Sequence, residues 1–109
     1  MDKFDDRYVL LQAMYEDGYY PYYLVDKIKW QFIHLIEFLE EADLKDKAAI
    51  QNRLDEFTMF INNLQQEFWD QGSEIETVAR ECIVSNLEYI LQWFKVQIPI
   101  DVALREREW

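Results

Sequence analysis

Four acidic side chains lie between positions 67 and 76, and they are the residues of this sequence best suited to chemistry. They are Glu67, Asp70, Glu74 and Glu76. Carboxylate oxygens that converge on one point are the ligands that hard cations such as Ca²⁺ require. The segment is too short for an EF-hand loop, however, and it lacks the Asp-x-Asp-x-Asp-Gly pattern of that motif. Glu-x-x-His, the signature of di-metal helical bundles, does not occur in the chain. We therefore expect no metal and no cofactor.

The same stretch fits the start of a helix. Ser73 followed by Glu76 forms a capping box, in which the serine hydroxyl and the glutamate carboxylate each accept a bond from the other residue's N–H. Glu74 would lie in the first helical turn, where the helix dipole favours an anion. Glu76 and Arg80 have the spacing of a helical ion pair. This structural interpretation is the one that the sequence favours.

The other reactive side chains do not form a catalytic set. The single histidine, His34, lies between apolar neighbours, and the single cysteine, Cys82, falls on the apolar face of a predicted helix, where a thiol is inert. The Ser73 hydroxyl is already used by the predicted cap, and the chain has no glycine-rich phosphate loop. We expect no catalytic residues and no enzyme.

Tyrosines crowd the amino-terminal part of the chain. The motif GYYPYY holds four of them, and they are Tyr19, Tyr20, Tyr22 and Tyr23. Tyrosine suits helix packing, but it is also favoured at protein interfaces because it offers a large contact area and a hydroxyl. The sequence leaves both interpretations open.

Periodic apolar residues predict that helices position all of these side chains. With only two glycines and two prolines, the composition suits a few long helices. The expected helices cover residues 5–16, 21–41, 45–69, 73–95 and 100–107. We predict an all-α fold over a single domain, 1–109, in which three long antiparallel helices form a compact bundle and short terminal helices pack on it.

This topology brings the tyrosines and the acidic turn to the same end of the bundle. The start of the second helix would lie beside the end of the third and the start of the fourth. The predicted protein-binding residues are Tyr19, Tyr20, Tyr22, Tyr23, Glu67, Trp69, Asp70, Glu74 and Glu76. A second acidic cluster, residues 37–43, occupies the opposite end.

The charge balance limits the kinds of partner. The chain has 22 acidic residues against 11 lysines and arginines, a net charge of −11. Such a surface repels nucleic acids and anionic membranes and attracts a basic protein. The other interpretation is that the charge serves only to keep the protein in solution. The sequence shows no signal peptide and no membrane-spanning run, and its one cysteine cannot form an internal disulfide. These features predict a cytoplasmic protein.

The sequence also resembles a family of small acidic bacterial proteins of unknown function. The resemblance covers most of the chain and lies in MYEDGYYPYYLVDKIK, INNLQQEFWDQGSEIETVARE and the final Arg107-Glu108-Trp109. It implies a compact helical fold and a bacterial cytosolic setting. No catalytic, cofactor or binding role is implied for any residue.

Three hypotheses remain. The first is a binding module that neutralises or regulates a basic protein, in the manner of an immunity protein or antitoxin. The second is a carboxylate-based metal protein or enzyme. The third is a structural homodimer that buries the tyrosine end.

Overall fold

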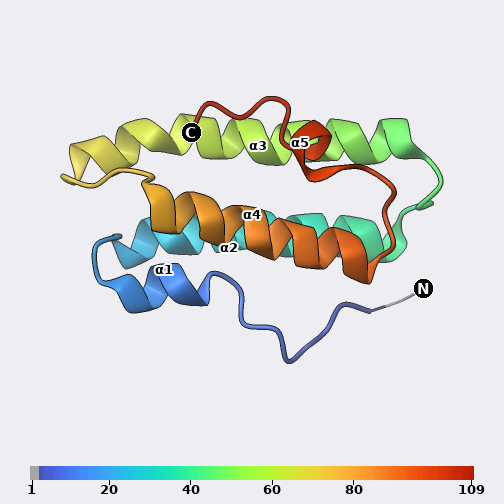
Figure 1. Ribbon diagram of the computed structural model, residues 1–109, viewed down its shortest axis with the longest axis horizontal. Coiled ribbons are helices and arrows are strands. Elements are labelled where there is room, and N and C mark those ends of the chain that lie inside the picture. Colours follow the sequence, from blue (N-terminus) through green and yellow to red (C-terminus); the bar gives the residue numbers. More distant parts are fainter. Residues whose placement is uncertain (1–2) are drawn as a thin grey trace.

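A computed structural model describes residues 3–109, and the regular elements within this range are all helices (Figure 1). They are α1 (Gln12–Asp17), α2 (Tyr22–Glu41), α3 (Lys47–Asp70), α4 (Thr77–Trp93) and α5 (Ile100–Ala103). The predicted all-α class is confirmed, and the three long helices pack together around one core. None of these helices is long and apolar enough to cross a membrane.

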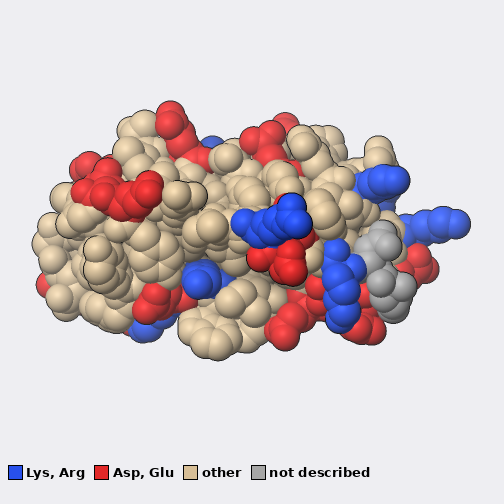
Figure 2. Space-filling model, turned by 90° about the horizontal axis from the view of Figure 1, so that it is seen from below, with Lys and Arg blue, Asp and Glu red and all other residues tan. Residues whose placement is uncertain are grey.

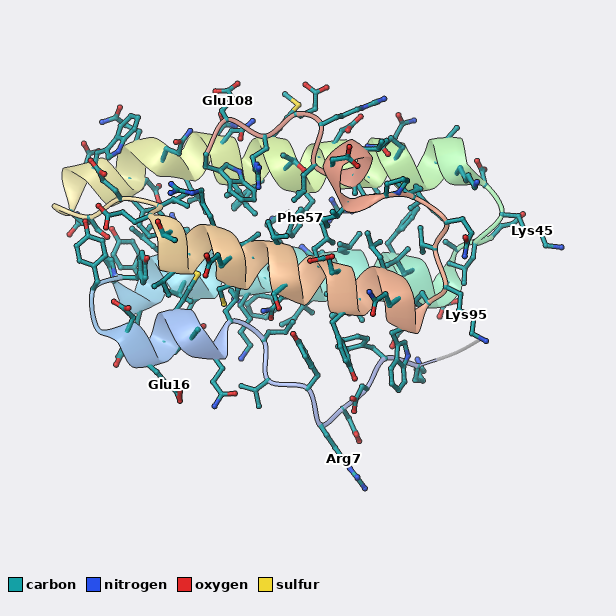
Figure 3. All side chains as sticks on the ribbon, in the orientation of Figure 1. Arg7, Glu16, Lys45, Phe57, Lys95 and Glu108 are labelled. Carbon is teal, nitrogen blue, oxygen red and sulfur yellow. The ribbon has the colours of Figure 1, made fainter. Side chains whose placement is uncertain are left out.

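The helices α2 and α3 form the main packed pair. Pro21 precedes α2, and the Asp46 side chain caps α3 by accepting a bond of 3.1 Å from the Ala49 N–H. Apolar residues at three- and four-residue steps bury one face of each helix. Phe32 of α2 meets Phe57 of α3 edge to face at 4.8 Å, and Phe57 points into the interior (Figure 3). The apolar periodicity of the sequence correctly predicts both helices.

The chain brings three helix ends together at one end of the molecule. In Figure 1 these ends, the start of α2, the end of α3 and the start of α4, all lie on the left. Lys27 of α2 joins Glu67 of α3 through contacts of 3.0 and 2.8 Å from its Nζ to the two carboxylate oxygens. The GYYPYY turn therefore lies beside the turn that connects α3 to α4.

The amino-terminal segment differs from its prediction. A helix from residue 5 was expected, but α1 begins at Gln12 because the preceding residues pack on α4 instead. The backbone of Leu11 has a φ of 58°, and its N–H donates to the buried side chain of Asn86 at 2.9 Å. Upstream, Tyr8 stacks on Tyr89 at 4.1 Å. These long-range contacts replace the local hydrogen bonds of the predicted helix.

Aromatic rings fix the same segment to the last turns of α4. Phe4 packs edge to face on Trp93 at 5.8 Å, and the Trp93 indole N–H donates to the Lys3 carbonyl at 2.9 Å. The Tyr89 hydroxyl donates to Asp5 at 2.7 Å. Residues 3–11 are thus attached mainly through side chains.

The helix α4 ends two residues earlier than predicted. Lys95 adopts a left-handed conformation with a φ of 58°. Its N–H donates to the Gln92 carbonyl at 3.1 Å, and the N–H of Val96 donates to the Leu91 carbonyl at 2.9 Å. This pair of bonds is a Schellman motif, in which glycine is the usual residue at the left-handed position.

The carboxyl-terminal helix is also shorter than predicted, since α5 ends at Ala103 and not near residue 107. Side chains of α3 hold the chain beyond it. Arg105 pairs with Asp55 at 2.6 Å, and Asn62 bonds the backbone of Glu106 and Glu108 at 2.7 and 2.9 Å. These bonds to α3 compete with continuation of the helix.

Candidate functional site

The turn between α3 and α4 is fixed by backbone hydrogen bonds to the last turn of α3. Gly72 has a φ of 71°, a conformation that glycine adopts without strain. Its N–H donates to the Trp69 carbonyl at 3.0 Å, and the N–H of Ser73 donates to the Phe68 carbonyl at 2.8 Å. This is a second Schellman motif, with Gly72 at its left-handed position.

The predicted capping box is wrong. The helix α4 begins at Thr77, and the N–H of Ser73 that the Glu76 carboxylate was expected to bind is already used by Phe68. The Ser73 hydroxyl instead donates to the Tyr19 carbonyl at 3.4 Å. Because the helix starts later, Glu74 lies outside its first turn.

The predicted ion pair between Glu76 and Arg80 is also absent from the structure. The Arg80 guanidinium donates to the Ile75 carbonyl at 3.1 Å and to the Thr77 hydroxyl at 3.2 Å. Both structural roles that the sequence assigned to Glu76 are therefore missing.

Tyr20 caps α4 in place of Ser73. Its hydroxyl accepts a bond of 3.1 Å from the N–H of Ala79, in the first turn of α4. The ring is only 4% exposed and meets Phe68 edge to face at 6.3 Å, and this burial raises the pKa of the Tyr20 phenol. Tyr20 was predicted to contact a partner, but the structure places it in the core. Nothing in the local sequence indicates a cap supplied from so far along the chain.

Residues 73–76 present two carboxylates on one side. None of these four residues is in a helix, and Glu76 has an extended backbone with a φ of −97° and a ψ of −170°. Ser73 and Ile75 are buried, whereas Glu74 and Glu76 are exposed. The two buried residues thus anchor the segment, and the two exposed residues display both acids.

A pocket of about 530 Å³ lies beside these acids. Its lining residues are Tyr19, Trp69, Gly72, Ser73, Glu74 and Glu76. The side chains of Tyr19 and Trp69 are 42% and 52% exposed, so two aromatic rings and two carboxylates share one open surface. The predicted proximity of the tyrosine turn and the acidic turn is confirmed for these residues.

The charges of the pocket have no internal counter-ion. Within residues 3–109, no lysine or arginine nitrogen lies within 4.0 Å of the Glu74 or Glu76 carboxylate. Glu67 differs, because Lys27 binds both of its oxygens, and Asp70 accepts a bond of 2.9 Å from Gln66. Acidic side chains are also spread along the face of the molecule in Figure 2. Glu74 and Glu76 are the two predicted acids whose side chains have neither an ion-pair nor a hydrogen-bond partner within residues 3–109.

Comparison with known proteins gives a family. A family model with the description "Family of unknown function (DUF5713)" matches residues 4–109, nearly the whole chain. The chain belongs to DUF5713. This result confirms the resemblance to a family of unknown function, while the bacterial origin stays a prediction. No curated protein and no solved structure shows a significant match to this DUF5713 chain.

The two remaining tyrosines of the GYYPYY motif lie outside the pocket. Tyr22 and Tyr23, in the first turn of α2, are 62% and 49% exposed. The Lys27 ammonium lies 5.9 Å from the centre of the Tyr23 ring, and the Tyr22 ring lies 6.0 Å from that of Tyr15. Both rings extend the aromatic surface at this end.

The two other reactive side chains of this DUF5713 protein lie on different helices. Cys82 is buried as predicted, and burial raises the pKa of its thiol. His34 is exposed on α2, in a groove of about 610 Å³ that it shares with Glu37, Glu41 and Arg53. Across the part of the chain that the structure describes, no group of three or more His, Cys, Asp or Glu side chains is arranged to hold a metal ion.

Proposed function

We propose that this DUF5713 protein is a small acidic binding module of the bacterial cytoplasm that docks a basic protein. In this proposal it neutralises or regulates its partner in the manner of an immunity protein or antitoxin. The observation that carries the proposal is the pair Glu74 and Glu76, which lie exposed beside the Tyr19 and Trp69 rings and have no counter-ion among residues 3–109.

Folding stability alone does not account for this arrangement. Two neighbouring carboxylates repel each other, and neither of them caps α4 or pairs with Arg80. Exposed tyrosine and tryptophan are typical of the energetic centres of interfaces, where they combine contact area with a polar group. A basic surface would neutralise the acids and cover the rings in the same step.

The net charge of −11 supports the same kind of partner. A strongly acidic surface increases the association rate of a basic protein by long-range attraction, and this effect weakens as salt increases. It also disfavours association with nucleic acids, because it repels their phosphates.

A charge-reversal comparison tests the docking face. Glu74→Lys/Glu76→Lys changes the pocket, while Glu37→Lys/Glu41→Lys makes the same change of charge in the groove near the other end of α2. Each variant and the wild type serve as bait in cells, and association rates with the captured protein are measured against salt. We expect the pocket variant to slow association about tenfold at low salt and to flatten its salt dependence. The control should change the rate less.

Four results would contradict the proposal. Equal losses in both variants would mean that bulk charge drives the contact, and a loss confined to the control would place the docking face at the other end. In native mass spectrometry, a retained metal ion would favour the metal-protein hypothesis instead. A stable dimer of the chain itself, dissociated by Tyr22→Ala/Tyr23→Ala, would favour the homodimer.

A further inference from the structure

We infer that the pocket formed by Tyr19, Trp69, Glu74 and Glu76 receives one cationic side chain, a lysine or an arginine, of the partner protein. This inference rests on the proposed function in assigning the cation to a protein partner. The recognition chemistry itself depends only on the pocket.

The aromatic walls suit an organic cation. An ammonium or guanidinium group within about 6 Å of an aromatic ring is attracted by the negative face of the ring, and tryptophan gives the strongest attraction. Trp69 and Tyr19 both line the pocket and leave about half of their surface exposed. The protein already makes this contact elsewhere, since the Arg107 guanidinium lies 5.1 Å from the centre of the Trp109 ring.

The carboxylates supply the charge that such a group needs. Glu74 and Glu76 both line the pocket, and Ile75 is buried between them. A neutral ligand that covered this surface would remove water from two carboxylates without giving them a partner, which is unfavourable. A guanidinium or ammonium would donate hydrogen bonds to them.

The pocket is also unsuited to the alternatives. Two carboxylates are fewer than the oxygen ligands of a Ca²⁺ site, and a volume of about 530 Å³ is large for a bare ion. Arg80, the cation nearest in sequence, bonds the start of α4, and Lys27 bonds Glu67. The end of a long basic side chain fits both the size and the charge.

Small probes test this inference without the partner. The indole N–H signal of Trp69 and the backbone signals of residues 72–76 are followed by NMR as N-acetylarginine amide or N-acetyllysine amide is added. N-acetylcitrulline amide, nearly the same shape as the arginine probe but uncharged, is the control ligand. We expect saturable shifts with dissociation constants of about 1–50 mM for one or both cations, and binding at least about fivefold weaker for citrulline.

Matched variants make the result specific. Glu74→Gln/Glu76→Gln keeps the shape of both exposed side chains and should weaken cation binding about fivefold or more. The Trp30 indole is similarly exposed, at 58%, but lies outside the pocket, so its signal should not move. An unchanged urea midpoint for the double variant verifies that it folds.

Several outcomes would overturn the inference. These are equal binding of citrulline and the cations, parallel shifts at Trp30, or no saturable shift at Trp69 up to about 100 mM. The two proposals fail separately. A partner captured through Glu74 and Glu76 without any probe binding would remove only the inference, whereas probe binding without a partner at this end would remove only the proposed function.

Discussion

Replacing Tyr20 with phenylalanine removes one oxygen atom and leaves the ring in place. The lost hydroxyl is the partner of the Ala79 N–H, and Ala79 is buried. In the first turn of α4, the helix itself offers this N–H no acceptor. A buried donor without a partner costs about 1–3 kcal/mol, and loss of a helix cap about 0.5–2 kcal/mol. We therefore expect Tyr20→Phe to lower the free energy of unfolding by about 1–2 kcal/mol.

Urea unfolding followed by circular dichroism measures this loss. With a slope near 2 kcal/mol per M, the midpoint should fall by about 0.5–1 M. Tyr22→Phe is the matched control, because it removes the same atom from a side chain that is 62% exposed, and it should change stability by less than about 0.5 kcal/mol. Hydrogen exchange at the Ala79 amide should accelerate in Tyr20→Phe and not in Tyr22→Phe.

The variant Ser73→Ala decides between the two possible caps. A capping box predicts a loss of about 1 kcal/mol for this change. In the structure, the Ser73 hydroxyl makes only a long bond of 3.4 Å to a carbonyl, so we expect a loss below about 0.5 kcal/mol. If Ser73→Ala is more destabilising than Tyr20→Phe, our account of the α4 start is refuted.

Three further predictions concern other parts of the fold. Lys95→Gly should raise the free energy of unfolding by about 0.5–1 kcal/mol in urea unfolding, because glycine tolerates the left-handed conformation at the end of α4; a loss would contradict this. Asn86→Ala should lower it by about 1–3 kcal/mol, since the Leu11 N–H loses its acceptor, and should speed labelling of the neighbouring Cys82 by thiol reagents. The bond from Arg105 holds the pKa of Asp55 below its usual value of 3.8, so the pair stabilises the fold at neutral pH and this stabilisation is lost as pH falls through the lowered pKa. Asp55→Asn should therefore flatten the decline of the urea midpoint between about pH 5 and pH 2.

Local patterns predict the long helices well and their ends less well. The apolar periodicity of α2 and α3 is strong because one face of each helix is buried along its length. The start of α4 was misplaced for a physical reason. Serine is a residue type that often caps helices, but the N–H of Ser73 completes the Schellman motif of the preceding helix. The N–H of Ala79, which needs an acceptor at the start of α4, is bound by the Tyr20 hydroxyl instead.

The position of the candidate site was predictable from the sequence, but which of its acids have a counter-ion was not. Topology and short connections place Tyr19 near Glu74 and Glu76. Which acids remain free depends on contacts between residues far apart in the sequence. Lys27 forms an ion pair with Glu67, and Arg80 donates to the Ile75 carbonyl and not to the Glu76 carboxylate. No spacing rule predicts either contact.

The weak attachment of residues 3–11 to α4 allows this segment to detach, and the fluorescence of Trp93 can report the detachment. Since this segment is held mainly by rings and by single hydrogen bonds, it is expected to detach from α4 at a lower free energy than global unfolding requires. Detachment would separate Tyr8 from Tyr89 and free the Trp93 indole from the Lys3 carbonyl. Trp93 would then report the opening through its fluorescence, and a break in its signal before the main transition would reveal a partly open species.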